Sequence, residues 1–324
     1  MSVTTSPDLV GSRTLPRHLA GPVVIWLLLL TAPYWVNAVG GYTALTTRVL
    51  IFGLAAMGLN FLLGFTGVMS FGHAAYFGLG CYGAGLTLRY LANSTPLALL
   101  NGILLGTAAA AVFGALIVRR KGVYFAMLTI AFGQICYYIA YSWNDFTGGY
   151  DGLRGFQRQP IGPINIQGNE FAFYYTVLFV FAVCTILMGL LLRSPFGRTL
   201  IAIRENQRRS LFLGIPVERH VWLSFTISAF FTSVAGALYA LLNNFADPSS
   251  LNYVISGDIV IMAVMGGMRS FWGPLIGAAV FVVLQDTISS MTVNWMSWIG
   301  IIFVVVVLFF PRGILGFIRH RATA

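Results

Sequence analysis

Two stretches of the sequence carry residues whose types and spacing could do chemistry. Ser70 and His73 lie three residues apart in "GFTGVMSFGH" (residues 64–73), which raises the possibility of a serine nucleophile with a histidine base. Ser70 is flanked by Met69 and Phe71 instead of the Gly-x-Ser-Gly setting of intramembrane serine proteases, so we expect neither hydrolysis nor any other catalytic role. The second stretch, "AIRENQRRSLFLGI" (residues 202–215), gathers charge in a chain that otherwise avoids it.

The composition of the chain indicates what surrounds these stretches. Only 9% of the 324 residues are charged, 58% are hydrophobic, and the mean hydropathy is +0.82. A soluble domain has about a quarter of its residues charged, so much of this chain must face lipid. The net charge of +10 is then better explained by cytoplasmic loops than by nucleic-acid binding. The sequence therefore predicts an all-α polytopic membrane protein.

Apolar segments long enough to cross a bilayer follow one another along the chain. A hydrocarbon core of ~30 Å needs about 20 apolar residues per helix. Residues 257–288 are ambiguous, since "GGMRSFWGP" could divide them into two short helices, 257–267 and 274–288. The other predicted spans are 20–39, 42–64, 74–92, 97–118, 122–142, 171–192, 221–242 and 295–310.

The distribution of arginine and lysine predicts the sidedness. A cytoplasmic N-terminus places the basic loops 119–121 and 193–220 inside and the nearly neutral loop 143–170 in the periplasm. If residues 257–288 cross twice, the tail with Arg319 and Arg321 also lies inside, as the positive-inside bias requires. We therefore expect ten spans in one domain (20–318), with cytoplasmic tails at 1–19 and 319–324.

Few polar side chains interrupt the predicted spans. Asn60, Ser70, His73 and Gln134 are candidates for a translocation path, although hydrogen bonds between helices explain each of them equally well. Arg48 lies near the predicted outer end of its helix, where we expect it to reach the headgroups. We find no ligand set for a metal or redox cofactor and expect no cofactor.

The charged stretch itself has the pattern of an amphipathic surface helix. Apolar and charged residues alternate between Thr199 and Leu213, Gly214 predicts the helix end, and Pro216 prevents continuation. A helix that only rests on anionic lipid has no need of Glu205 or Asn206, so we expect it to fit a groove on another protein.

This stretch resembles the cytoplasmic coupling loop of ATP-binding-cassette (ABC) importer permeases. The wider pattern is similar to the branched-chain amino acid permease family, in particular its LivM-like subunits. The similarity runs in order through residues 58–84, 121–135, "TGGYDGLRG" (147–155), 202–215, "GGMRSFWGPLIGAA" (266–279) and "PRGILG" (311–316).

The resemblance implies a fold of the vitamin-B12-importer type in the bacterial inner membrane. It also implies four kinds of partner: a LivH-like second permease, two ATP-binding subunits, a periplasmic solute-binding protein and the lipid bilayer. ATP hydrolysis belongs to the partners, so this chain is not expected to be an enzyme. We assign docking of the ATPase to Arg204, Glu205, Asn206 and Arg209, and the end of the coupling helix to Gly214.

Alternatives to this assignment remain open at the level of sequence. The same motifs occur in importers of urea, amides and aromatic acids, and a passive channel for a small neutral solute would also explain the sparse neutral lining. The channel leaves the charged loop without a role.

Overall fold

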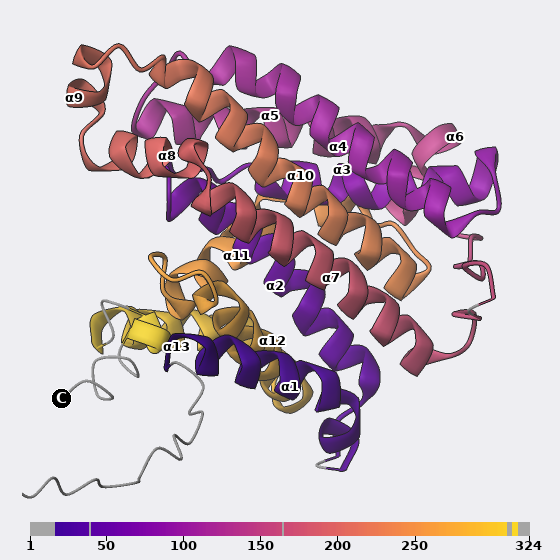
Figure 1. Cartoon of the computed structure of the whole chain (residues 1–324). Helices are drawn as coiled ribbons and strands as arrows, with labels where there is room; N and C mark the ends of the chain where they lie inside the picture. The colour runs from indigo at the N-terminus through magenta and orange to yellow at the C-terminus, as the bar shows by residue number, and fades with distance from the viewer. Residues whose placement is uncertain (1–16, 39, 164, 310–312, 317–324) are drawn as a thin grey trace, which may run out of the picture.

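The computed structural model describes residues 17–38, 40–163, 165–309 and 313–316 (Figure 1). Of the predicted cytoplasmic tails, residues 1–16 and 319–324 lie outside the described residues. Regular structure in the described part is helical, apart from a single antiparallel bridge between Leu153 and Ala246.

Ten helices of 14 residues or more occupy the places of the ten predicted segments. They are α1 (Arg17–Ala38), α2 (Thr43–Leu63), α3 (His73–Leu86), α4 (Thr95–Ile117), α5 (Val123–Ser142), α7 (Glu170–Arg193), α10 (Val217–Asn243), α11 (Tyr253–Gly266), α12 (Gly273–Met291) and α13 (Trp295–Phe309). Short helices fill the connections: the π-helix η1 (Thr87–Leu91), α6 (Asn144–Thr147), the 3₁₀ helix η2 (Gly149–Asp151), α8 (Pro195–Glu205), α9 (Gln207–Phe212) and the 3₁₀ helix η3 (Pro248–Leu251).

The ambiguous segment 257–288 forms two helices, α11 and α12. Both are longer than expected, with 14 and 19 residues in place of 11 and 15. Asn252 caps α11 by accepting the N–H of Val254, so the helix begins at Tyr253, and Pro274 lies in the first turn of α12, where its missing N–H costs nothing. With 19 residues, α12 is long and apolar enough to cross a membrane, whereas α11 is shorter.

Among the described residues, six helices are long and apolar enough to cross a membrane, namely α2, α4, α5, α7, α10 and α12. Shorter apolar helices lie at 22–38, 253–266 and 295–306. These lengths and compositions define a multi-pass membrane protein.

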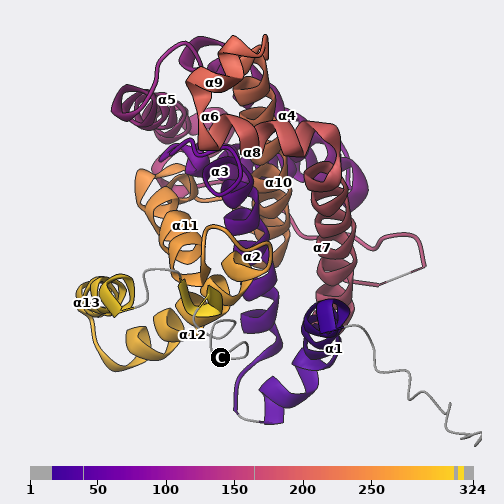
Figure 2. The same cartoon turned by 60° about the vertical axis from the view of Figure 1, so that its left-hand side comes forward.

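The core of the bundle lies where α2, α3, α4 and α10 meet (Figures 1 and 2). Small residues allow this contact: Gly80 lies on the backbone of Ser233, Gly236 on that of Phe77, and Gly83 faces Gly102. A side chain at any of these positions would have to displace a neighbouring backbone. The peripheral helix α13 packs on α11 and α12.

Connections between the helices gather at two ends of the bundle. At the first, the coupling-loop end, Arg204 donates to the carbonyl of Gly64, and Asn60 Nδ2 donates to the carbonyl of Ser270 at 3.0 Å. At the second, the opposite end, Arg89 donates to the carbonyl of Arg154 at 2.9 Å and Tyr42 to Asp286 at 2.6 Å. The turn between α11 and α12 therefore lies beside the end of α2, and α12 leads back to the beginning of α2.

Candidate functional site

The charged stretch folds into two helices, so the expectation of one amphipathic helix from Thr199 to Leu213 is wrong. Ser194 caps α8, which begins at Pro195. The helix stops at Asn206, whose side chain accepts the N–H of Arg209 at 2.9 Å and so caps α9. An Asn that bonds to the backbone ahead of it competes with the continuing helix, which is why the chain breaks here. Gly197 lies inside α8 against the backbone of Leu191 and Leu192.

Helix α8 is attached to the bundle by its apolar side. Leu200 and Ile203 are buried, and Ile203 packs with Val217 and Val221 of α10 in a small apolar cluster. Val68 and Val118, from the connections that follow α2 and α4, pack against the same cluster. Any displacement of α8 is therefore passed by direct contact to α10 and to two connections of the membrane bundle.

Helix α9 presents an apolar tip to its surroundings. Phe212 is 92% exposed and Leu213 is 73% exposed, and Leu211 beside them is also exposed. Gly214 follows at φ +79°, a backbone conformation that costs a residue with a side chain ~1–2 kcal/mol. Isolated large apolar residues on a surface are ordinary, whereas three in succession at the end of a short helix form an exposed apolar patch.

The sequence reasoning chose charged residues in this loop and missed the apolar tip. The periodic pattern predicted for residues 199–213 uses Leu211 and Leu213 but not Phe212, and three successive apolar residues cannot all lie on one face of a helix. The signal available in the sequence was this run of three apolar residues between a charged cluster and Gly214.

The structure places the predicted docking residues in two different environments. Glu205, Asn206, Arg209 and Gly214 are exposed. Arg204 is half-buried and bonded to the carbonyl of Gly64. Burial lowers the pKa of the Arg204 guanidinium, Arg269 acts in the same direction, and Glu205 opposes both. Arg204 therefore anchors α8 to the end of α2 within its own chain.

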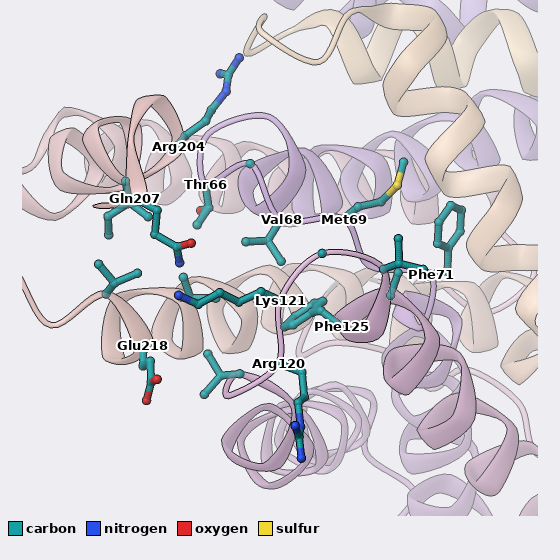
Figure 3. Close-up of a pocket in the computed structure, with 18 residues that line it drawn as sticks. Thr66, Val68, Met69, Phe71, Arg120, Lys121, Phe125, Arg204, Gln207 and Glu218 are labelled. Atoms are coloured by element: carbon teal, nitrogen blue, oxygen red, sulfur yellow. The ribbon is translucent and has the colours of Figure 1, made fainter. Parts of the chain in front are cut away.

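A pocket of about 550 Å³ opens between α8, the start of α10 and the connections after α2 and α4 (Figure 3). Lys121 and Gln207 extend into it beside Val68 and Phe125, whereas the Arg204 guanidinium points away from the other lining side chains (Figure 3). The pocket therefore opens directly beside the contacts that α8 makes with α10 and with the two connections.

The four candidate path residues do not line this pocket. Asn60, Ser70 and His73 are fully buried, and Gln134 is half-buried on α5. Asn60 Oδ1 and Gln134 Nε2 have no hydrogen-bond partner in the described part of the chain. Their role in a path stays a prediction.

Ser70 and His73 are joined to two other helices by hydrogen bonds. Ser228 of α10 donates to the carbonyl of Gly58 at 2.6 Å, so its oxygen is free to accept from His73 Nε2 at 2.7 Å. His73 Nδ1 then accepts from Ser70 at 3.0 Å. The imidazole therefore links the start of α3 to α10 and, through Ser228, to α2. These are the interhelical bonds that the sequence left open as an explanation of both residues.

The helical bundle is that of a multi-pass membrane protein, and comparison with known proteins identifies the family to which it belongs. The family described as "Branched-chain amino acid transport system / permease component" matches residues 41–311. The chain belongs to this family.

Individual relatives are similar over most of the chain. The high-affinity branched-chain amino acid transport system permease protein LivM of Escherichia coli (strain K12) is 26% identical over 92% of this chain and 75% of its own. BraD of Pseudomonas aeruginosa, a permease of the same description, is 25% identical over 87% of this chain and 96% of its own. The L-arabinose ABC transporter permease protein AraH of Azospirillum brasilense is 23% identical over 89% and 76%. A comparison with solved structures finds no match.

Proposed function

We propose that this chain is the LivM-like permease subunit of an ABC importer that moves branched-chain or other hydrophobic amino acids across the bacterial inner membrane. Its partners are a LivH-like permease, two ATP-binding subunits and a periplasmic solute-binding protein. Ten helices cross the membrane in a fold of the vitamin-B12-importer type, with both termini in the cytoplasm. The coupling-loop end then faces the cytoplasm, and the loop 143–170 faces the periplasm.

The observation that carries this proposal is the exposed tip of α9 on a helix pair that is fastened to the bundle at one side. Phe212 and Leu213 are apolar and accessible, while Glu205 and Arg209 beside them supply charges of both signs. An aromatic anchor with a charged rim is the usual composition of an interaction hot spot. A passive channel would have no use for such a surface.

The transmission of movement follows from the contacts of α8. An ATPase that pulls on α9 acts through Asn206 on α8, and Ile203 passes the displacement to α10 and to the connections after α2 and α4. Such a partner shifts the population of two bundle conformations only if it binds them with different affinities. Arg204 keeps α8 aligned with the end of α2 throughout.

The test is co-purification of the ATPases with the permease pair after co-expression of all four subunits. Replacing an exposed aromatic anchor in an interface costs about 2 kcal/mol or more, a factor of ~30 in affinity. We expect Phe212→Asp to lose the ATPases while the two permeases still co-elute, and the double variant Glu205→Lys with Arg209→Glu to weaken retention as well.

The matched control is Tyr150→Asp, because Tyr150 is 74% exposed but lies at the opposite end of the bundle. Full retention of the ATPases by this control is expected. If Phe212→Asp keeps the ATPases as wild type does, the tip of α9 is not the docking site. If wild type binds no ATPase although the permease pair is folded, the channel alternative replaces the importer.

A further inference from the structure

A cavity of about 260 Å³ lies at the opposite end of the bundle, where α10 ends and η3 and α11 begin. Its lining comes from α3, α10, α11 and the connection between α10 and α11. Asn243 and Ser249 of this lining are exposed, so the cavity is accessible from outside the bundle at this end. Pockets for drug-sized ligands measure about 300–1,000 Å³, so this smaller cavity suits a small solute.

Asp247 is the only charged residue among the described residues that line this cavity. The guanidinium of Arg154 lies over the ring of Phe245 at 5.4 Å, but Arg154 is not part of the lining. The acidic residues of the loop 143–170 do not line the cavity either. The cavity therefore presents a single negative charge to whatever enters it.

The carboxylate of Asp247 also caps η3. One oxygen accepts the N–H of Ser249 at 3.0 Å, and the other accepts the hydroxyl of the same residue. An ionised carboxylate has about four acceptor positions, so about two remain for a further donor. The other side-chain caps in the described part of the chain are Asn or Ser, at positions 169, 194, 206 and 252. Because these residues cap helices as well as Asp does, capping does not explain the charge of Asp247.

Three aromatic rings face the same cavity, those of Phe77 on α3, Tyr239 on α10 and Phe245 on the connection that follows. The rings of Phe77 and Tyr239 contact each other, with centroids 5.3 Å apart. The face of an aromatic ring attracts a cation within about 6 Å, and it also covers apolar groups. A carboxylate beside aromatic rings is therefore suited to an organic ammonium group with an apolar remainder.

The connection between α10 and η3 is held in place by the loop 143–170. Ala246 exchanges two backbone hydrogen bonds with Leu153, at 2.8 and 3.1 Å. Asn244 accepts the N–H of Arg158 at 2.9 Å. Asp247 directly follows these contacts, so its position is fixed before any ligand arrives. A site that is ordered in advance loses less conformational freedom on binding.

We propose that this cavity binds the ammonium group of a hydrophobic amino acid. Asp247 accepts hydrogen bonds from the ammonium, and the aliphatic side chain lies against Phe77 and Tyr239. A neutral solute such as urea has no charge to complement that of Asp247. This inference rests on the proposed function and adds to it a substrate site within the permease chain itself.

The test measures equilibrium binding of labelled 3-methylbutylamine to the complete transporter in nanodiscs, without the binding protein. This amine has the ammonium and the side chain of leucine but no carboxylate. We expect Asp247→Asn to lower the affinity for the amine by about tenfold or more, as for a lost hydrogen bond between charged groups, while Asn keeps the cap on η3. The matched control is Asp151→Asn, since Asp151 is exposed at the same end and does not line the cavity. Its affinity is expected to stay within about twofold of wild type.

Competition separates recognition of the ammonium from binding in a merely apolar cavity. We expect L-leucine to displace the labelled amine, and 4-methylpentanoate, which lacks the ammonium, to leave it bound. Displacement by 4-methylpentanoate, no displacement by leucine, or equal affinities in the Asp247→Asn and Asp151→Asn variants would overturn the site.

Uptake of leucine driven by ATP, measured in parallel with the binding protein present, distinguishes this inference from the proposed function. Uptake by the wild-type transporter without saturable binding of the amine would overturn the site and leave the importer intact. Binding of the amine that depends on Asp247, without any uptake of leucine, would overturn the importer and leave the ammonium site.

Discussion

At the scale of single residues, the hydrogen bonds of His73 illustrate how the break before α3 is held in place. Its ring is fully buried, and both nitrogens have hydroxyl partners, Ser70 on the break and Ser228 on α10. Backbone that is not helical at membrane depth is tolerated only where protein surrounds it. The imidazole supplies that support for residues 64–72.

We therefore predict that His73→Ala destabilises the protein, because it leaves Ser70 without its partner and Ser228 without a donor. Two such buried hydrogen bonds, one of them between helices, contribute about 1–3 kcal/mol in total. Thermal unfolding in detergent should show a lower Tm for this variant. His220→Ala, which removes a histidine at the coupling-loop end, is the control and should change the Tm much less. Equal losses in the two variants would contradict the structural role of His73.

At the scale of elements, the contact between α3 and α10 depends on glycine. Gly236 of α10 lies directly on the backbone of Phe77, so an added methyl group has no space unless the helices separate. Gly189 of α7 has no neighbouring atom within 4 Å of the same position. The two glycines lie in helices of similar apolar composition and differ in what they touch.

Gly236→Ala is accordingly predicted to destabilise the bundle by about 1–3 kcal/mol through overpacking. Gly189→Ala should be neutral or stabilising by up to about 1 kcal/mol, since Ala is the better helix former. Unfolding curves of the two variants, measured under the same conditions, test this difference in stability. A stable Gly236→Ala protein would mean that α3 and α10 can move apart without cost.

At the scale of the whole molecule, the alternation of helix ends predicts which surfaces are accessible from each side of the membrane. Phe212, Tyr150 and Val293 lie on three different connections between the long helices. Their side chains are 92%, 74% and 95% exposed, respectively. With ten spans, position 212 faces the cytoplasm, whereas positions 150 and 293 face the periplasm. A single crossing by residues 257–288 would place position 293 inside.

Single cysteines at these positions, in a protein whose three buried native cysteines are replaced, test the arrangement. We expect a membrane-impermeant thiol reagent added to intact cells to label Tyr150→Cys and Val293→Cys, and to label Phe212→Cys only after the membrane is opened. Labelling of position 293 only in opened cells would exclude ten spans.

Much of the helical arrangement follows from the sequence, because a long apolar segment that is surrounded by lipid has one regular conformation open to it, the helix. The places of the ten long helices and the division of residues 257–288 were predicted on that basis. The family was predicted from motifs that extend over nearly the whole chain, and the match at residues 41–311 confirms it. These are properties that depend on the local order of residues.

Only the tertiary structure decided what individual side chains contact. Composition cannot tell that Arg204 binds Gly64 of its own chain, that Asn206 divides the coupling helix, or that Phe212 is left exposed. Helix formation is determined by neighbours along the chain, whereas the partner of a polar group is determined by neighbours in space.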